Sequence, residues 1–137
     1  SNPEKTAKAV YRMLSSVTSF FSRQNNERSM TICAREMVEY IHTNYMYNLS
    51  LIDMAKFVHL HPKYASTLFS RNTGKTFVQY LNYYRISKAK EIITDNPEIS
   101  QDLVASMVGY ENQRNYYKVF KKICDYTPGE YRKKSAP

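Results

Sequence analysis

Arg114, Asn115 and Lys118 are the residues of this sequence whose side chains are best suited to reading the edges of DNA bases. Arg and Lys hydrogen-bond to O6 and N7 of guanine, and Asn pairs with adenine. The apolar residues around them recur at helical spacing, so we expect the three side chains on the outer face of one helix. Because a major groove admits one α-helix, they indicate sequence-specific contact with double-stranded DNA.

A second helix, earlier in the chain, has a similar outward polar face, but its polar side chains there are hydroxyls and one lysine. The candidates for base contact are Lys63, Ser66, Thr67, Gln113, Arg114, Asn115 and Lys118. The candidates for phosphate contact, towards the C-terminal halves of the two helices, are Ser70, Arg71, Lys121 and Lys122. The residues expected to face the core are Tyr64, Leu68 and Phe69 in the first helix and Tyr116, Val119 and Phe120 in the second, while Tyr117 fits either face. The alternative interpretation is two ordinary solvated helix faces.

The two candidate helices belong to two copies of one unit, residues 50–74 and 100–125. The matching pairs are Ser50/Ser100, Ala55/Ala105 and Val58/Val108 at an offset of 50, then Leu68/Val119 and Phe69/Phe120 at an offset of 51. The one-residue change falls in the turn between two short helices, where an insertion costs least. Two short helices joined by a tight turn, with a basic second helix, describe a helix-turn-helix. A scaffold repeat is the alternative, but such repeats stack directly and usually need three or more copies.

Helix-terminus signals support both units and predict one more helix. Ser50 and Asp53 resemble a capping box, Pro62 fits the first position of a helix, and Gly74 fits the residue after its end. In the second unit Ser100 is the expected N-cap. Near the C-terminus, Thr127, Pro128 and Glu130 predict a last short helix that Tyr131 anchors on the core, followed by a disordered tail from residue 133.

The stretch from 76 to 94 is expected to be one long helix that spaces the two units. Neither Gly nor Pro interrupts it, whereas Gly74 precedes it and Pro97 follows it. Its apolar stripe is Phe77, Leu81, Tyr84, Ala89 and Ile92.

The N-terminal part predicts two further helices. In residues 4–26, apolar residues step by three and four over about two heptads, which is too short to establish a coiled coil. This helix either packs on its own domain or is a linker or dimerisation helix. Residues 24–29 are polar and are expected to form a loop. The helix of residues 31–45, capped by Thr31, is expected to bury Ile32, Met37, Val38, Ile41 and Tyr45.

Composition favours an all-α protein of one small domain or two very small ones. The chain has 137 residues, of which 42% are hydrophobic, and only three are Gly. The net charge is +8, and residues 112–137 hold seven Lys or Arg against two Asp or Glu. A basic cluster of this kind indicates nucleic acid or another anionic surface. No apolar run is long enough to span a membrane, and the two widely spaced cysteines favour thiols in a reducing, cytoplasmic setting.

Other chemistries are poorly supported. His59 and His61 lie two residues apart, but no cysteine is near them in sequence, so a zinc site is not expected. Glu36 and Glu39 are three residues apart on a helix surface and need no catalytic role. No Gly-rich phosphate loop is present. We therefore expect neither an enzyme nor a cofactor.

Taken together, the motifs resemble the DNA-binding domain of AraC/XylS-type transcription regulators. The residues that carry the resemblance are His61-Pro62-x-Tyr64, Leu68-Phe69, Thr73-Gly74, Tyr80-Leu81, Arg85, Ala89, Val108-Gly109-Tyr110, Val119-Phe120-Lys121-Lys122 and Thr127-Pro128-x-Glu130-Tyr131-Arg132. The resemblance covers residues 32–134. Arg114, Asn115 and Tyr117 depart from the family's common pattern, and so does His61, which replaces a small capping residue.

The resemblance implies an all-α fold with two helix-turn-helix subdomains joined by a long central helix, here with an extra N-terminal helix. It divides the chain into a linker or dimerisation helix, 1–30, and a DNA-binding domain, 31–134. It implies a bacterial cytoplasmic transcription regulator, either an activator or a repressor, that inserts two recognition helices into successive major grooves. RNA polymerase is then a further partner, and a homodimer could form through an upstream region or through the helix of residues 4–26. The alternative function is a helical protein-interaction module with a basic face.

Overall fold

The computed structural model describes residues 3–135, and within this range the side chains of all residues except 15–28. The described chain forms seven helices and no strand, which confirms the all-α prediction. The helices are α1 (Pro3–Asn44), α2 (Leu51–Phe57), α3 (Pro62–Thr73), α4 (Phe77–Asp95), α5 (Gln101–Met107), α6 (Gln113–Cys124) and α7 (Pro128–Ser135). None of the helices in the described range is long and apolar enough to cross a membrane.

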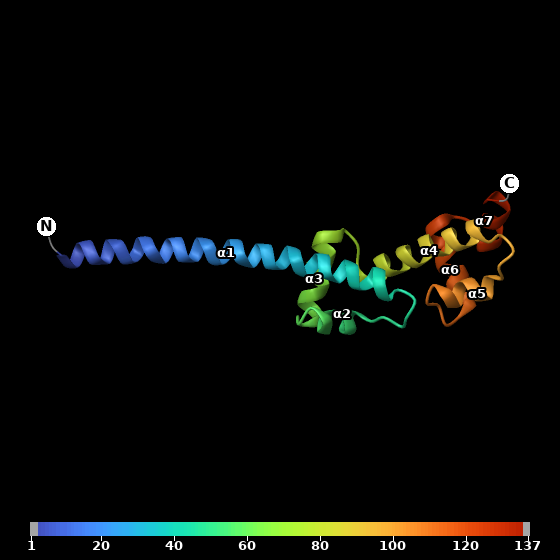
Figure 1. The fold of residues 1–137 in the computed structure, drawn as a ribbon, viewed down its shortest axis with the longest axis horizontal. Helices are drawn as coiled ribbons and strands as arrows, with labels where there is room; N and C mark the ends of the chain where they lie inside the picture. The colour runs from blue at the N-terminus through green and yellow to red at the C-terminus, as the bar shows by residue number, and fades with distance from the viewer. Residues whose placement is uncertain (1–2, 136–137) are drawn as a thin grey trace.

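Helix α1 corrects the predicted N-terminal organisation. It is one continuous helix of 42 residues, so the loop expected at 24–29 and the cap expected at Thr31 are both wrong. The reason is local. Residues 24–29 contain no Gly or Pro, and they include Gln, Glu and Arg, which are good helix formers. The first half of α1 extends away from the rest of the molecule, whereas its second half packs on α2 and α3 (Figure 1).

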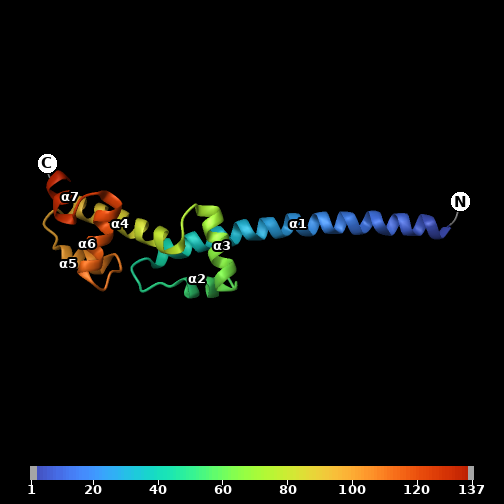
Figure 2. The same cartoon turned by 180° about the vertical axis from the view of Figure 1, so that it is seen from behind.

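The rest of the chain forms two small helical bundles joined by α4. The second half of α1 packs with α2 and α3 in the first bundle, and α5, α6 and α7 form the second (Figures 1 and 2). Helix α4 contacts α3 near its start and α5, α6 and α7 further along. This arrangement confirms two helix-turn-helix units separated by a long helix.

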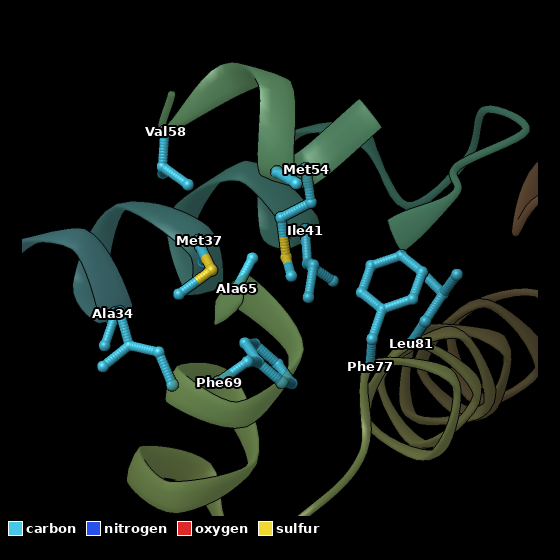
Figure 3. Packing of buried hydrophobic residues seen from close by; sticks show 11 residues of the cluster. Ala34, Met37, Ile41, Met54, Val58, Ala65, Phe69, Phe77 and Leu81 are labelled. Atoms are coloured by element: carbon cyan, nitrogen blue, oxygen red, sulfur yellow. The ribbon is translucent and has the colours of Figure 1, made fainter. Parts of the chain in front are cut away.

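The first bundle has a core of aliphatic, methionine and phenylalanine side chains contributed by four helices (Figure 3). Its members are Ala34, Met37 and Ile41 of α1, Met54, Ala55 and Val58 of the α2 region, Ala65, Leu68 and Phe69 of α3, and Phe77 and Leu81 of α4. Ile32, which was expected inside, is about half exposed, at 46%, and so is Ile52 of α2, at 54%. In α2 the neighbouring Met54 takes the buried position, because α2 meets the core through Met54 and Ala55.

The second bundle repeats this plan with larger aromatic side chains. Its buried members are Ile86, Ala89 and Ile93 of α4, Val104, Ala105, Val108 and Tyr110 of the α5 region, and Tyr116, Val119 and Phe120 of α6. Tyr131 of α7 packs on this core, with its ring 5.7 Å from that of Phe120, as predicted for an anchor. Helix α7 continues to Ser135, so the disordered tail predicted from residue 133 is wrong for residues 133–135.

Helix α4 serves both cores, which explains where the predicted apolar stripe fails. Phe77, Leu81 and Ala89 are buried as expected, but Tyr84 and Ile92 are only half-buried. A helix that packs on two bundles in succession turns a different face to each, so one straight stripe cannot describe it. Buried Ile86, Ile93 and Arg85 were outside the predicted stripe.

The capping signals predicted from Ser50 onward are confirmed. Ser50 and Asp53 form a reciprocal capping box, and Ser100 caps α5 through the amide of Leu103. Gly74 ends α3 at φ +75°, a left-handed conformation that glycine adopts without strain. Thr76 and Gln79 form a further capping box, at the start of α4, which was not among the predicted caps.

Candidate nucleic-acid interface

Helix α3 is the second helix of the first unit and begins with an unusual cap. Nδ1 of His61 accepts a hydrogen bond of 3.2 Å from the amide of Lys63, while Pro62 occupies the first helical turn. Ala65, Leu68 and Phe69 are buried, which leaves Lys63 and Thr67 exposed on the other side. Of the remaining candidates on α3, Arg71 is exposed and Ser66 and Ser70 are half-buried.

Helix α6 is the second helix of the second unit, and its polar and apolar faces are sharply separated. Oδ1 of Asn112 caps it by accepting hydrogen bonds from the amides of Arg114 and Asn115, at 2.8 and 3.4 Å. The buried face is Tyr116, Val119 and Phe120, as predicted. The exposed candidates are Arg114, Asn115, Lys118, Lys121 and Lys122. The first turn of α6 therefore presents Arg114 and Asn115 on a backbone that its cap holds in place.

Two predicted orientations need revision. Tyr64, expected in the core, is 44% exposed, because its hydroxyl reaches α1 and donates to the sulfur of Met30 at 3.0 Å. Gln113, expected to be outward, is half-buried and donates from Nε2 to the hydroxyl of Tyr117 at 3.1 Å. Tyr117, which fitted either face, is half-buried beside Tyr116. A base contact by Gln113 would therefore compete with this hydrogen bond.

Among the described residues, no acidic side chain forms an ion pair with the basic face of α6. An ion pair joins Lys88 and Glu91 on α4, away from the lysines of α6. Lys118, Lys121 and Lys122 are therefore charged, exposed and unneutralised. Such a surface attracts phosphate, and counterion release makes its binding to DNA depend on salt.

A groove between the two units extends this surface and includes residues that the sequence analysis did not select. It is lined by Gly74, Lys75, Gln79, Asn82, Tyr83, Asn115, Lys118, Val119, Lys122 and Ile123. The ammonium of Lys75 lies 5.1 Å from the centre of the Tyr83 ring. Residues from the start of α4 and from the outer face of α6 line this groove together. Helix α4 therefore contributes residues to the candidate DNA-binding surface, in addition to separating the two units. The signal in the sequence was a run of polar residues on the exposed side of a helix, which is too common to be diagnostic.

No zinc site was expected among the histidines and cysteines. Among the described residues, no group of three or more His, Cys, Asp or Glu side chains could hold a metal ion. Cys33 and Cys124 are both free thiols.

The sequence comparisons agree with this geometry. A family model described as a helix-turn-helix domain matches residues 54–134. The HTH-type transcriptional regulator YtdP of Bacillus subtilis is 31% identical over 96 residues, which are 70% of this chain and 12% of that protein. The melibiose operon regulatory protein of Escherichia coli K12 is 28% identical over 118 residues, which are 86% of this chain and 39% of that protein. The chain thus spans 12% to 39% of the length of these two relatives.

Solved structures show the same fold. The C-terminal domain of AraT, a response regulator from Geobacillus stearothermophilus, superposes with a TM-score of 0.72 at 28% identity, covering 74% of this chain and 84% of that one. An AraC-type regulator from Chromobacterium violaceum gives a TM-score of 0.69 at 20% identity, covering 77% and 94% of the two chains. The DNA-binding domain of AdpA, solved in complex with a target DNA, gives a TM-score of 0.68 at 19% identity, covering 74% and 90%.

Two helix-turn-helix units on one spacer helix define a DNA-binding domain of a transcription regulator. This chain belongs to the helix-turn-helix family of AraC type, which confirms the resemblance inferred from its motifs.

Proposed function

We propose that this chain binds a specific double-stranded DNA site by inserting α3 and α6 into two successive major grooves. The observation that carries the proposal is the pairing of two capped helices, each buried on one side and polar on the other, at the two ends of α4. Successive major grooves on one face of DNA are about 34 Å, or 10–10.5 base pairs, apart. One chain can then make the contacts that other helix-turn-helix proteins make as dimers.

The two helices contribute unequally to recognition. Arg114 and Asn115 lie in the exposed first turn of α6, the part of a recognition helix that reaches base edges. Lys118 follows one turn later, and Lys121 and Lys122 lie where phosphates are the nearer ligands. On α3, Lys63, Ser66 and Thr67 face the bases, with Ser70 and Arg71 towards the phosphates. The hydroxyl of Thr67 already donates to the carbonyl oxygen of Lys63 at 3.1 Å, which weakens it as a donor to bases.

The similar proteins support this function. The AdpA domain, which has the same fold, was solved with a target DNA. The relatives are regulators of transcription, and the one from Staphylococcus xylosus is a lactose operon transcription activator. We accordingly propose a bacterial cytoplasmic transcription regulator that acts on RNA polymerase once it is bound to DNA.

The exposed part of α1 suggests a second interface. Val10 and Leu14 are 46% and 58% exposed, and they lie four residues apart on the side of α1 that carries the predicted apolar seam. An exposed apolar seam on a long helix is the usual contact face of a coiled coil. We propose that α1 pairs with α1 of a second copy, weakly in this chain because the seam covers only about two heptads.

Footprinting on a site selected from a random duplex library tests the proposal. We expect two protected major-groove tracts about one helical turn, or 10–10.5 base pairs, apart on one face of the DNA. Protection of a single tract would show that one unit is only structural. Binding that does not discriminate between the selected site and random duplex would contradict specific DNA recognition and favour a protein-interaction module with a basic face.

A further inference from the structure

Arg85 is a buried charged residue at the point where the two bundles meet. It lies in the middle of α4 and is 8% exposed. Its Nε donates to the carbonyl oxygen of Tyr45 at 2.8 Å, and its Nη2 donates to that of Tyr47 at 2.7 Å. Both carbonyls belong to the segment that follows α1, so Arg85 ties the spacer helix to the first bundle.

The same guanidinium also faces the second bundle. Its central carbon lies 5.2 Å from the centre of the Tyr110 ring, in the turn between α5 and α6. The hydroxyl of Tyr110 donates to Oδ1 of Asn82, one turn before Arg85 on α4, at 2.9 Å. Burial raises the pKa of Tyr110 to about 12, so its phenol stays neutral near neutral pH. Burial lowers the pKa of Arg85, but an arginine side chain keeps its charge in proteins.

Gly109 packs against Arg85 and the backbone of Tyr45 so closely that no side chain would fit at its position. A Cβ placed there would lie 2.5 Å from the carbonyl oxygen of Tyr45 and 2.9 Å from Nε of Arg85. His59 occupies the matching position of the first unit at φ +58°, so a similar left-handed turn accommodates a side chain there. The glycine in the second unit therefore lets the turn before α6 touch the segment after α1 directly.

These contacts form one junction of Tyr45, Tyr47, Arg85, Gly109 and Tyr110. Tyr45 packs against the buried cores of both bundles. Helix α6 begins at Gln113, three positions after Tyr110, so the junction lies immediately before the recognition helix of the second unit. The two bundles are thus held by a direct contact in addition to the spacer helix.

We infer that Arg85 is a positioning residue for DNA recognition, which holds α6 at one orientation relative to α3 and so sets the spacing of base pairs that the domain accepts. The inference rests on the proposed two-groove binding. The buried residues form two separate cores, one for each bundle, so α4 alone would leave the second bundle some freedom to pivot relative to the first. Bonds from one guanidinium to two carbonyls, with an aromatic ring on its other side, remove that freedom.

The test compares Arg85→Gln with wild type on two duplexes. One has the two half-sites at the selected spacing, and the other has about five additional base pairs, half a helical turn, between them. Wild-type affinity should fall by more than about 100-fold on the insertion, because the second helix no longer reaches its groove. In Arg85→Gln, affinity for the selected site should fall by about tenfold and the penalty for the insertion should shrink to about tenfold or less. Affinity for one isolated half-site should not change.

Lys88→Gln is the matched control, because it removes the same charge from the same helix outside the junction. It should keep the wild-type penalty for the insertion. Arg85→Gln that loses affinity equally at every spacing, or in the same proportion on the isolated half-site, would overturn the inference and leave Arg85 a residue of stability alone.

A measurement on the wild-type protein avoids any loss of folding in the variant and needs no DNA. Residual dipolar couplings of the free domain should fit one alignment tensor for both bundles. Two distinct tensors would mean that the junction does not hold them, even if the domain binds its DNA specifically. If the tensor is single but the domain does not discriminate between DNA sequences, the proposed function fails while the junction stands.

Discussion

Replacing Arg114 by alanine should separate base reading from general attraction to DNA. The side chain is exposed in the first turn of α6, and no described acidic residue pairs with it. Its removal should therefore change the free energy of unfolding by less than about 0.5 kcal/mol. The loss should appear in the complex, where one bidentate contact with a base contributes about 1–3 kcal/mol.

The matched change is Lys121→Ala, two turns further along the same face and equally exposed. A lost phosphate contact weakens all sequences alike and reduces the slope of log K against log salt by about 0.9. Arg114→Ala should instead lower affinity for the selected site by about 5- to 160-fold, which is 1–3 kcal/mol, and relax selection at one position.

Both variants can be measured by fluorescence anisotropy on the selected and random duplexes at several salt concentrations, with urea unfolding as the test of folding. If Arg114→Ala and Lys121→Ala lose the same fraction of affinity on both duplexes, α6 does not read bases through Arg114. A fall in the stability of Arg114→Ala by several kcal/mol would show that its exposed position has been misjudged.

Three further outcomes are expected. Phe69→Ala, which empties a fully buried position in the first core, should lower the free energy of unfolding by about 3–5 kcal/mol in urea titrations. Partial burial and the charge of Lys88 lower the pKa of His42 below its ordinary value of 6.5. The neutral imidazole therefore contributes fully to stability above that pH, and its contribution declines as the pH falls. Thermal melts at about pH 7.5 and 5.5 should therefore differ more in wild type than in His42→Gln. Deleting residues 1–26 should abolish any weak dimer seen by sedimentation and leave DNA affinity per chain unchanged.

Each of these outcomes can be contradicted directly. A small effect of Phe69→Ala would mean that the first core closes around the cavity. Equal pH dependence in wild type and His42→Gln would remove the role of His42, whose Nε2 lies 2.8 Å from the hydroxyl of Tyr80. A tight dimer that survives the deletion would place the association interface outside the first half of α1.

The features that could be predicted from sequence are those whose causes are local. The caps at Ser50 and Ser100 need only a side-chain oxygen that accepts from the amide three residues later, and the duplication repeats that pattern 50 residues on. The inward faces of α6 were also predictable, because Tyr116, Val119 and Phe120 follow helical spacing. The division of polar from apolar residues in α6 therefore required no tertiary information.

What could not be predicted depends on where distant segments meet. Arg85 is buried because two carbonyls, 38 and 40 residues earlier in the chain, accept its hydrogen bonds. Nothing local distinguishes it from Lys88 and Lys90 of the same helix, which are only half-buried. The prediction that Tyr64 lies in the core was wrong for the same reason, because its hydroxyl donates a hydrogen bond to the sulfur of Met30 on α1. The polar run at 24–29 was misread as a loop, although it contains no residue that ends a helix.

The unequal chemistry of the two helices has a consequence when it is combined with the junction at Arg85. Helix α3 offers few strong donors to bases, so alone it should bind weakly. Once α6 is in its groove, a rigid connection presents α3 to the next groove at high effective concentration, and modest contacts then suffice. Substituting base pairs under α6 should therefore cost more affinity than substituting base pairs under α3, about 1–3 kcal/mol each against less than 1. Saturation mutagenesis of the selected site would measure this, and equal costs in both halves would show that α3 reads sequence as strongly as α6.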